Sequence, residues 1–304
     1  MARYAITGST GLIGEALAAS LAAAGHQVQR VTRDAARAQA QDVVWDVAGG
    51  SIEGAKLEGV DVVIHLAGEP IGAARWTEDT KRRIRDSREQ GTGLLARTLA
   101  ALDAPPRVFL SCSAVGFYGD RGDEILTEDS GPGDDFLAEV CVAWEQAAQP
   151  AIDAGIRTIH PRTGVVIAED GPLIDKIDLP FRLGVGGRVG NGRQYVPWIS
   201  LEDEVRALRF LAEHDELSGP VNLVGPEPVT NRELTRALGQ VLRRPTVLPI
   251  PPVAIRLLYG EMGVTLATVS NRVLPARLTD AGFTFTHTTL VAALEAALLD
   301  GQAA

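Results

Sequence analysis

The chain has 304 residues and a formal net charge of −10. That length suits one large α/β unit with a smaller lobe, and the negative charge argues against a nucleic-acid partner because a phosphate backbone would be repelled. The chain has two cysteines, no pattern of a secretory leader after Met1, and no run of the roughly 20 apolar residues that a membrane helix needs. We therefore expect a cytoplasmic protein with no membrane partner.

Strand and helix patterns alternate from the start of the chain. Short apolar runs that indicate buried strands lie at 4–6, 28–31, 43–45, 60–66, 108–110 and 156–160. A helical period follows the first run and stops at Gly25, and further helices are expected at 78–102 and 136–154. Strands that are separated by helices in this way imply a parallel sheet.

The pattern changes beyond Arg162. Glycines crowd residues 184–192, which excludes a regular helix or a packed strand and favours a long functional loop. A helix at 201–214 and a strand at 221–223 are expected to return to the sheet. We therefore predict a Rossmann-type doubly wound parallel sheet from residues 1–165 with 200–225, and a smaller C-terminal α/β lobe from residues 166–199 and 226–304.

Glycines recur every third residue where the first strand gives way to the first helix. Gly8 permits a tight turn, Gly11 lets the backbone approach a diphosphate, and Gly14 brings the helix close to the sheet. The free amides at the start of the helix then face the anion. The predicted phosphate cradle consists of Gly8, Ser9, Thr10, Gly11, Leu12, Ile13 and Gly14.

The end of the second strand indicates which dinucleotide binds. A site selective for NAD usually has an acidic residue there, whereas this chain has Arg33, whose guanidinium suits a 2′-phosphate. We therefore predict NADP(H), with NAD as the alternative because Asp34 follows directly. Asp46, after the third strand, is either an acceptor for the adenine amino group or an ordinary turn residue.

Several segments together resemble the extended short-chain dehydrogenase/reductase family, which includes NAD-dependent epimerases and dehydratases. Besides the glycine motif, segments 65–68, 91–92, 111–119 and 160–165 match, and they occur in the family's order. The resemblance implies additional cofactor contacts from the segment under the cofactor, the end of the serine strand and the Arg-Pro segment near the nicotinamide. These residues are Leu66, Ala67, Gly68, Ser111, Pro161 and Arg162.

The C-terminal part of the chain narrows the resemblance. Segments 251–263 and 272–283, and the loop 192–199 with Asp203, are similar to those of one atypical subgroup. These are the epimerase family proteins once labelled cell-division-inhibitor-like, which carry a C-terminal domain of unknown function. The resemblance thus implies an NADP(H)-linked oxidoreductase or nucleotide-sugar epimerase.

The usual catalytic pair of the wider family is missing. In that family a Tyr moves the substrate proton, a Lys four residues later lowers the pKa of the Tyr and holds the ribose, and a Ser orients the substrate. Here Phe136 with Val140, or Leu137 with Cys141, occupies the spacing of the pair, and neither combination can shuttle a proton. Ser113 still matches the orienting serine.

Two functions stay open after this loss. In the first, the chain is an enzyme whose acid is Tyr118, Glu69 or Cys141, although each of these residues has an ordinary structural role as its alternative. In the second, it is a non-catalytic NADP(H)-dependent sensor in which the cofactor sets the position of the smaller lobe. A purely structural interaction module conflicts with the intact phosphate cradle.

A substrate is expected outside the carboxyl ends of the strands, between the sheet and the smaller lobe. Arginine and aromatic side chains there suit a small anionic or planar molecule, although Trp76 and Trp198 are equally suited to packing between the lobes. The candidate lining residues are Glu69, Arg75, Trp76, Arg193, Tyr195 and Trp198. The sequence predicts no metal site and is compatible with a homodimer.

Overall fold

Seven parallel strands form the centre of the molecule. In this computed structural model, which describes residues 1–299, they lie in the order β13-β9-β6-β5-β1-β2-β3. Their bounds are β1 (Arg3–Thr7), β2 (Gln27–Thr32), β3 (Val43–Asp46), β5 (Val62–His65), β6 (Val108–Ser111), β9 (Arg157–Thr163) and β13 (Gly219–Leu223). The antiparallel β4 (Ser51–Ile52) closes one edge, and β7 (Ser113–Ala114) extends the line of β6 beside β9. The predicted Rossmann-type sheet is confirmed.

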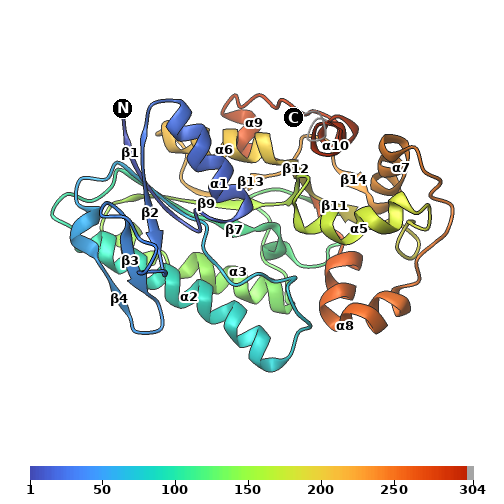
Figure 1. The fold of residues 1–304 in the computed structure, drawn as a ribbon, viewed down its shortest axis with the longest axis horizontal. Helices are drawn as coiled ribbons and strands as arrows, with labels where there is room; N and C mark the ends of the chain where they lie inside the picture. Colours follow the sequence, from blue (N-terminus) through green and yellow to red (C-terminus); the bar gives the residue numbers. More distant parts are fainter. Residues whose placement is uncertain (300–304) are drawn as a thin grey trace.

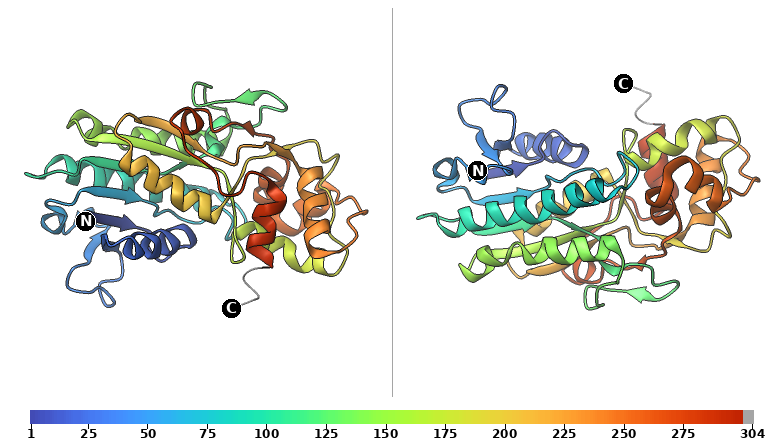
Figure 2. Two further views of the ribbon diagram at one scale, coloured as in Figure 1. Left: turned by 90° about the horizontal axis from the view of Figure 1, so that it is seen from above. Right: turned by 90° about the horizontal axis from the view of Figure 1, so that it is seen from below.

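Helices cover both faces of this sheet. On one face lie α1 (Leu12–Ala23) and α6 (Leu201–Glu213), and on the other α2 (Glu78–Ala100), α3 (Phe136–Gln146) and α4 (Gln149–Asp153) (Figures 1 and 2). Because both faces are covered, β5 and β6 are buried along their whole length. Alternate residues of β1 serve the two faces: Tyr4 and Ile6 pack with α1 and α6, whereas Ala5 packs with α2.

One predicted helix is divided in two. The segment expected to be helical over 136–154 contains α3 and α4, with a break at Ala147 and Ala148. Pro150 lies in the first turn of α4. Proline has no N–H to continue a preceding helix, and it is well tolerated in a first turn, so a new helix begins there.

A smaller lobe lies beyond the carboxyl ends of β9 and β13, at the right of Figure 1. Its core contains Trp198, Phe181 and Leu294. The pairs β10–β12 and β11–β14 form two short sheets, and the glycine-rich segment 184–192 is a loop, as expected. Elements of the lobe are β10 (Val165–Ile167), α5 (Pro172–Arg182), β11 (Tyr195–Val196), β12 (Trp198–Ser200), β14 (Val229–Thr230), α7 (Asn231–Leu242), α8 (Pro252–Thr268) and α10 (Leu290–Leu298).

Part of the C-terminal segment packs on the large sheet. Leu278 of α9 (Ala276–Asp280) and Phe283 belong to the same buried cluster as Leu17 of α1. The segment 226–304, which we assigned to the smaller lobe, therefore contains a stretch that returns to the sheet, and its residues 300–304 lie outside the described residues. The remaining short elements are the 3-10 helices η1 (Gly54–Leu57) and η2 (Val115–Tyr118) and the paired strands β8 (Ile125–Leu126) and β15 (Arg272–Val273).

Within residues 1–299, no helix is both long enough and apolar enough to cross a membrane. The same residues contain no group of three or more His, Cys, Asp or Glu side chains that could hold a metal ion.

Candidate functional site

The turn between β1 and α1 is built so that no side chain fills it. Gly8 has a φ of +67°, and a Cβ atom on it would lie 3.0 Å from the backbone of Leu66 and Ala67. A Cβ atom on Gly14 would lie 2.2 Å from the carbonyl oxygen of Gly8, so α1 can approach the turn this closely only with glycine at that position. On Gly11 the nearest atom would be 3.4 Å away, which leaves that side of the turn open.

The first amides of α1 are not capped by a side chain. The other long helices on the sheet begin with such a cap, since Thr77, Asp135 and Ser200 accept from backbone N–H groups of α2, α3 and α6. The N-cap residue of α1 is Gly11, which has no side chain that could accept a hydrogen bond. Uncapped amides and the positive end of a helix dipole form a site for an anion.

Leu66 and Ala67 are held against β1 by hydrogen bonds to Thr7. The Thr7 hydroxyl oxygen accepts from the N–H groups of Leu66 (3.0 Å) and Ala67 (3.1 Å), and it lies 2.7 Å from Nδ1 of His65. The hydroxyl hydrogen therefore points to Nδ1, which places the imidazole proton on Nε2. Burial lowers the pKa of His65 to about 3, so this buried ring is neutral.

The edge beside β2 presents an exposed cation. Arg33 follows β2 and makes no hydrogen bond or ion pair with any of residues 1–299. The Asp34 carboxylate is engaged in its own turn, where it accepts from the N–H groups of Ala36 (3.1 Å) and Arg37 (3.2 Å). Asp46 likewise accepts from the N–H of Gly49 (3.0 Å), which is the turn role we weighed for it.

Two predicted serines lie buried where β6 ends. The hydroxyl groups of Ser111 and Ser113 have no hydrogen-bond partner within the described residues. A buried hydroxyl without a partner is costly, so its retention indicates a ligand or an ordered water. Of the residues with the spacing of the missing pair, Leu137 and Cys141 lie close to the adjacent turn at Gly116, and Leu137 also packs against the cluster that contains Val140.

Tyr118 is committed to a buried network. Its hydroxyl donates to Oδ1 of Asn222 (2.7 Å) and accepts from Nη1 of Arg162 (3.0 Å). Arg162 in turn makes a two-pronged ion pair with Glu145, at 2.8 and 2.9 Å. Burial raises the pKa of Tyr118. These contacts favour the packed structural role for Tyr118, and they keep the Arg162 guanidinium occupied inside the protein.

Cys141 is also a poor acid in this environment. Burial raises the pKa of its thiol to about 12. Of the three acids considered from the sequence, only Glu69 has its carboxylate near the surface, 3.5 Å from the Arg83 guanidinium.

Both candidate tryptophans pack inside the protein. Trp198 is 1% exposed in the core of the smaller lobe, and its Nε1–H donates to the carbonyl of Glu227 (3.0 Å). Trp76 is 9% exposed, donates to the carbonyl of Ile71 (2.9 Å), and meets Phe136 edge to face. Their surroundings support the packing role that we weighed against substrate contact.

The other candidate lining residues lie on two different segments. Arg75 donates to the carbonyl groups of Leu257 (2.6 Å) and Leu258 (2.9 Å), so it joins the loop after β5 to helix α8. Arg193 is exposed just after the glycine-rich loop, and Tyr195 begins β11, where the Arg272 guanidinium lies 5.1 Å from its ring centroid. Ligand contact for Arg193 and Tyr195 therefore stays a prediction.

Glu204 is a buried carboxyl group that the sequence did not single out. It is fully buried in the first turn of α6, its Oε1 accepts from the Thr163 hydroxyl (2.8 Å), and its Oε2 has no partner within the described residues. Burial raises the pKa of Glu204 to about 8, so the group is mostly protonated at neutral pH. Acidic residues are common at helix starts, and for this reason Glu204 looked ordinary in the sequence.

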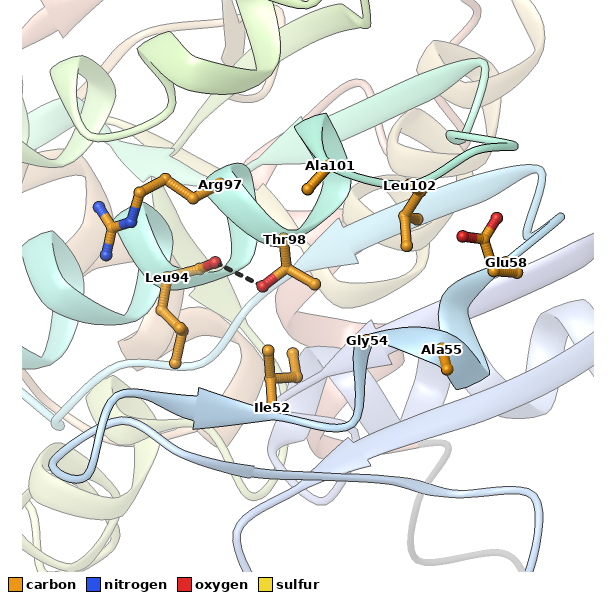
Figure 3. Close-up of a pocket in the computed structure, with 9 residues that line it drawn as sticks. All are labelled: Ile52, Gly54, Ala55, Glu58, Leu94, Arg97, Thr98, Ala101 and Leu102. Atoms are coloured by element: carbon orange, nitrogen blue, oxygen red, sulfur yellow. Dashed lines mark hydrogen bonds between the residues drawn. The ribbon is translucent and has the colours of Figure 1, made fainter.

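One surface hollow lies away from these residues. It is enclosed between β4, η1 and the C-terminal turns of α2, and Figure 3 shows Ile52, Leu94 and Leu102 facing into it. This hollow is at the amino ends of the strands. Because doubly wound sheets bind ligands at their carboxyl ends, we do not assign the dinucleotide to it.

The close contact at Gly14 gives a first prediction. Gly14→Ala should destabilise the protein by about 1–3 kcal/mol, because the new methyl group overlaps the Gly8 carbonyl and α1 must move. Gly11→Ala, the matched control, should cost less than about 1 kcal/mol, since its methyl group meets nothing closer than 3.4 Å. Urea unfolding measures both values, and equal losses would contradict the assigned contact.

The burial of Glu204 gives a prediction about pH. Its pKa is raised in the folded protein, so its contribution to stability is complete below pH 4.5 and is lost as the pH rises through about 8. Wild type should therefore lose stability relative to Glu204→Gln between pH 5 and 8, by up to about 1.4 kcal/mol per pH unit.

Urea unfolding of both proteins at several pH values measures this difference. Glu202→Gln is the control, because Glu202 is an exposed glutamate in the same turn of α6; its stability should depend on pH as that of wild type does. Parallel profiles for wild type and Glu204→Gln would show that Glu204 titrates normally.

Comparison with known proteins agrees with this geometry. Residues 4–166 match the NAD dependent epimerase/dehydratase family, and residues 250–297 match a domain of unknown function, DUF1731. An epimerase family protein of Mycobacterium bovis is 44% identical over 290 residues, which are 95% of each chain.

Two solved structures are similar over nearly the whole of this chain. The human epimerase family protein SDR39U1, crystallised with NADPH, is 32% identical with a TM-score of 0.88, covering 97% of this chain and 98% of that one. A nucleoside-diphosphate sugar epimerase of Corynebacterium glutamicum is 37% identical with a TM-score of 0.81, covering 98% of this chain and 58% of that one. The resemblance inferred from the motifs is confirmed, and the chain belongs to the NAD dependent epimerase/dehydratase family as an atypical short-chain dehydrogenase/reductase.

Proposed function

We propose that the chain is an NADP(H)-dependent oxidoreductase or epimerase that works without the Tyr–Lys pair of its family. The observation that carries this proposal is the open cradle at Gly8–Gly14, where α1 begins without a side-chain cap. The cradle fits a diphosphate because the backbone can be approached at Gly11 and the helix amides face outward. The NADPH in the structure of human SDR39U1 supports the same assignment.

The phosphorylated form of the cofactor suits the residues after β2. Arg33 is exposed and unpaired within residues 1–299, whereas the Asp34 carboxylate is held by its own turn. A carboxylate that bound the ribose would repel a 2′-phosphate, and a guanidinium would attract it. NADP(H) is thus favoured over NAD, with Asp46 held in a turn rather than free for the adenine.

A bound nicotinamide would supply the hydride chemistry, and the chain's own residues would position the substrate. The unpartnered hydroxyl of Ser113 is suited to orient a substrate oxygen. Among the acids named from the sequence, Glu69 stays available for proton transfer, because Tyr118 donates to Asn222 and the Cys141 thiol has a pKa of about 12. We propose a small anionic or planar substrate, because Arg193 and Tyr195 lie beside the glycine-rich loop.

A second function is favoured by a specific set of contacts. Besides Arg75, Lys81 joins α2 to the smaller lobe through an ion pair with Glu261 (2.8 Å), and Trp76 packs in one cluster with Met262 of α8. The segment that follows the cofactor loop is thus tied to α8. A cofactor that moved this segment would also move the lobe, which is the behaviour of an NADP(H)-dependent sensor.

The choice of cofactor predicts a difference in thermal stabilisation. NADPH should raise the melting temperature of wild type more than NADH at equal concentration, since a ligand that binds the folded state stabilises it by mass action. Arg33→Gln should lower NADPH affinity roughly tenfold to a hundredfold and leave NADH unchanged, as expected for a lost charge-assisted hydrogen bond. Arg37→Gln, a substitution at an exposed position in the same turn, should change the affinity for neither cofactor. Equal shifts of the wild-type melting temperature with NADPH and NADH would show that Arg33 does not select the cofactor.

Hydride exchange distinguishes the enzyme from the sensor. With NADPH deuterated at C4, a reductase should transfer label to a quinone or a small carbonyl compound, which can accept a hydride. With NADP⁺, an epimerase should take label into the nicotinamide from a nucleotide sugar that is deuterated at the carbon to be oxidised. Ser113→Ala should slow the observed transfer by roughly tenfold or more while NADPH affinity is retained, because only substrate orientation is lost. Tight NADPH binding with no transfer to or from any compound would favour the sensor.

A further inference from the structure

Arg88 of α2 is a partly buried cation with no carboxylate of the described residues in direct contact. Its Nη1 donates to the carbonyl oxygens of Glu69 (2.9 Å) and Ile84 (3.1 Å), and its guanidinium lies over the Trp144 ring, 4.8 Å from the centroid. Within residues 1–299 no carboxylate lies within 4.0 Å of it, and its Nε and Nη2 donate no hydrogen bond. Burial lowers the pKa of Arg88, and the charge of the Glu69 carboxylate opposes this shift in part.

The surroundings of Arg88 use only part of its hydrogen-bonding capacity. A buried arginine is normally paired with a carboxylate, whereas this guanidinium has two carbonyl groups and one aromatic ring as its partners. Two donor nitrogens of the fork stay unused. Nε and Nη2 of Arg88 are therefore free to donate hydrogen bonds to the oxygen atoms of a ligand.

The guanidinium lies directly beside the loop after β5. A Cβ atom on Gly68 would be 3.2 Å from Cζ of Arg88, so only glycine leaves a ligand access to the cation at this point. On the other side is Cys141 of α3, whose pKa is raised by burial and lowered in part by the charge of Arg88. The Ser113 hydroxyl lies next to the same thiol. Arg88 thus lies near Cys141, which is one of the two residues with the spacing of the missing lysine.

The order of the strands indicates which part of a dinucleotide reaches this place. Along the carboxyl edge the neighbours are β2, β1, β5 and β6, which present Arg33, the cradle, Gly68 and Ser113 in turn. A dinucleotide with its 2′-phosphate at Arg33 and its diphosphate at the cradle extends across β5 toward β6. Its nicotinamide riboside would then lie near Gly68, next to Arg88.

We propose that Arg88 binds the ribose hydroxyl groups of the nicotinamide half of NADP(H), so that a cation from α2 replaces the lysine that α3 lacks. This inference rests on the proposed cofactor. It assigns to Arg88 a binding role, in which the free donors Nε and Nη2 hold the riboside over Gly68 beside Ser113.

The test compares a whole cofactor with half of one. Dissociation constants are measured by calorimetry for NADPH and for 2′,5′-ADP, which keeps the phosphorylated ribose and lacks the nicotinamide mononucleotide half with its phosphate. Arg88→Met keeps an unbranched stem and removes the charge. It should weaken NADPH binding about tenfold, as expected for one charge-assisted interaction, and leave 2′,5′-ADP binding unchanged. Retained 2′,5′-ADP binding also shows that the variant is folded.

Two further variants make the result specific. Arg88→Lys should recover most of the NADPH affinity, since a cation is restored. Arg85→Met, on the same helix but exposed and paired with Glu139 (2.9 Å), should bind both ligands as wild type does. The inference is overturned if Arg88→Met binds NADPH normally, or if it loses the two ligands equally. If wild type binds neither ligand, the proposed function fails together with this inference. If wild type binds both ligands and Arg88→Met binds NADPH as tightly as wild type does, only this inference is overturned.

Discussion

The close approach of α1 to the turn before it is the contact on which the candidate site depends. Gly14 lies against the Gly8 carbonyl at a distance that excludes any side chain. That contact fixes the direction of α1, and with it the place where the uncapped amides point. Strand β5 pairs with β1, so the same turn also fixes the position of the loop that follows β5. In that loop, the N–H groups of Leu66 and Ala67 donate to the Thr7 hydroxyl.

Buried polar groups at this edge serve mainly to hold the fold rigid. Tyr118 joins η2 to β13 through Asn222 and to β9 through Arg162, and Arg162 reaches α3 through Glu145. Each member of this network satisfies the next, so removing one would leave a buried charge or hydroxyl unpaired. A phenol placed in such a network is not available to exchange protons with a substrate, and this agrees with its raised pKa.

The sequence was sufficient for the sheet and for the cradle because both depend on local patterns. Runs such as Val62–His65 are apolar along their whole length, which is typical of strands that are covered on both faces. The division between α3 and α4 was missed, although Pro150 marks it. The short stretch around Leu278 that returns to the sheet has no distinguishing pattern, because its contacts are made with residues that are distant in the sequence, such as Ser218 and Pro220 beside Arg277.

The burial of Arg88 and Glu204 could not be inferred from local sequence patterns. Whether a charged residue on a helix is solvated or buried depends on what packs over it, and neither Trp144 over Arg88 nor Thr163 beside Glu204 is near in sequence. The exposure of the two tryptophans was undecided for the same reason. Conversely, Arg33 was identifiable from its position alone, since the residue after the second strand of this fold always lies at the edge of the sheet.

The position of Arg88 bears on which chemistry the chain can retain. In the Tyr–Lys arrangement one cation both holds the ribose and lowers the pKa of the phenol, so the two tasks are lost together if the lysine is lost. A guanidinium on α2 can take over the first task without the second, because the residue with the spacing of the tyrosine is Phe136 or Leu137, and the phenol of Tyr118 donates to Asn222. Cofactor binding and proton transfer are thereby separated. Such a site can bind a dinucleotide firmly while its proton comes from a different group, such as Glu69, and it can also bind a dinucleotide without reacting at all.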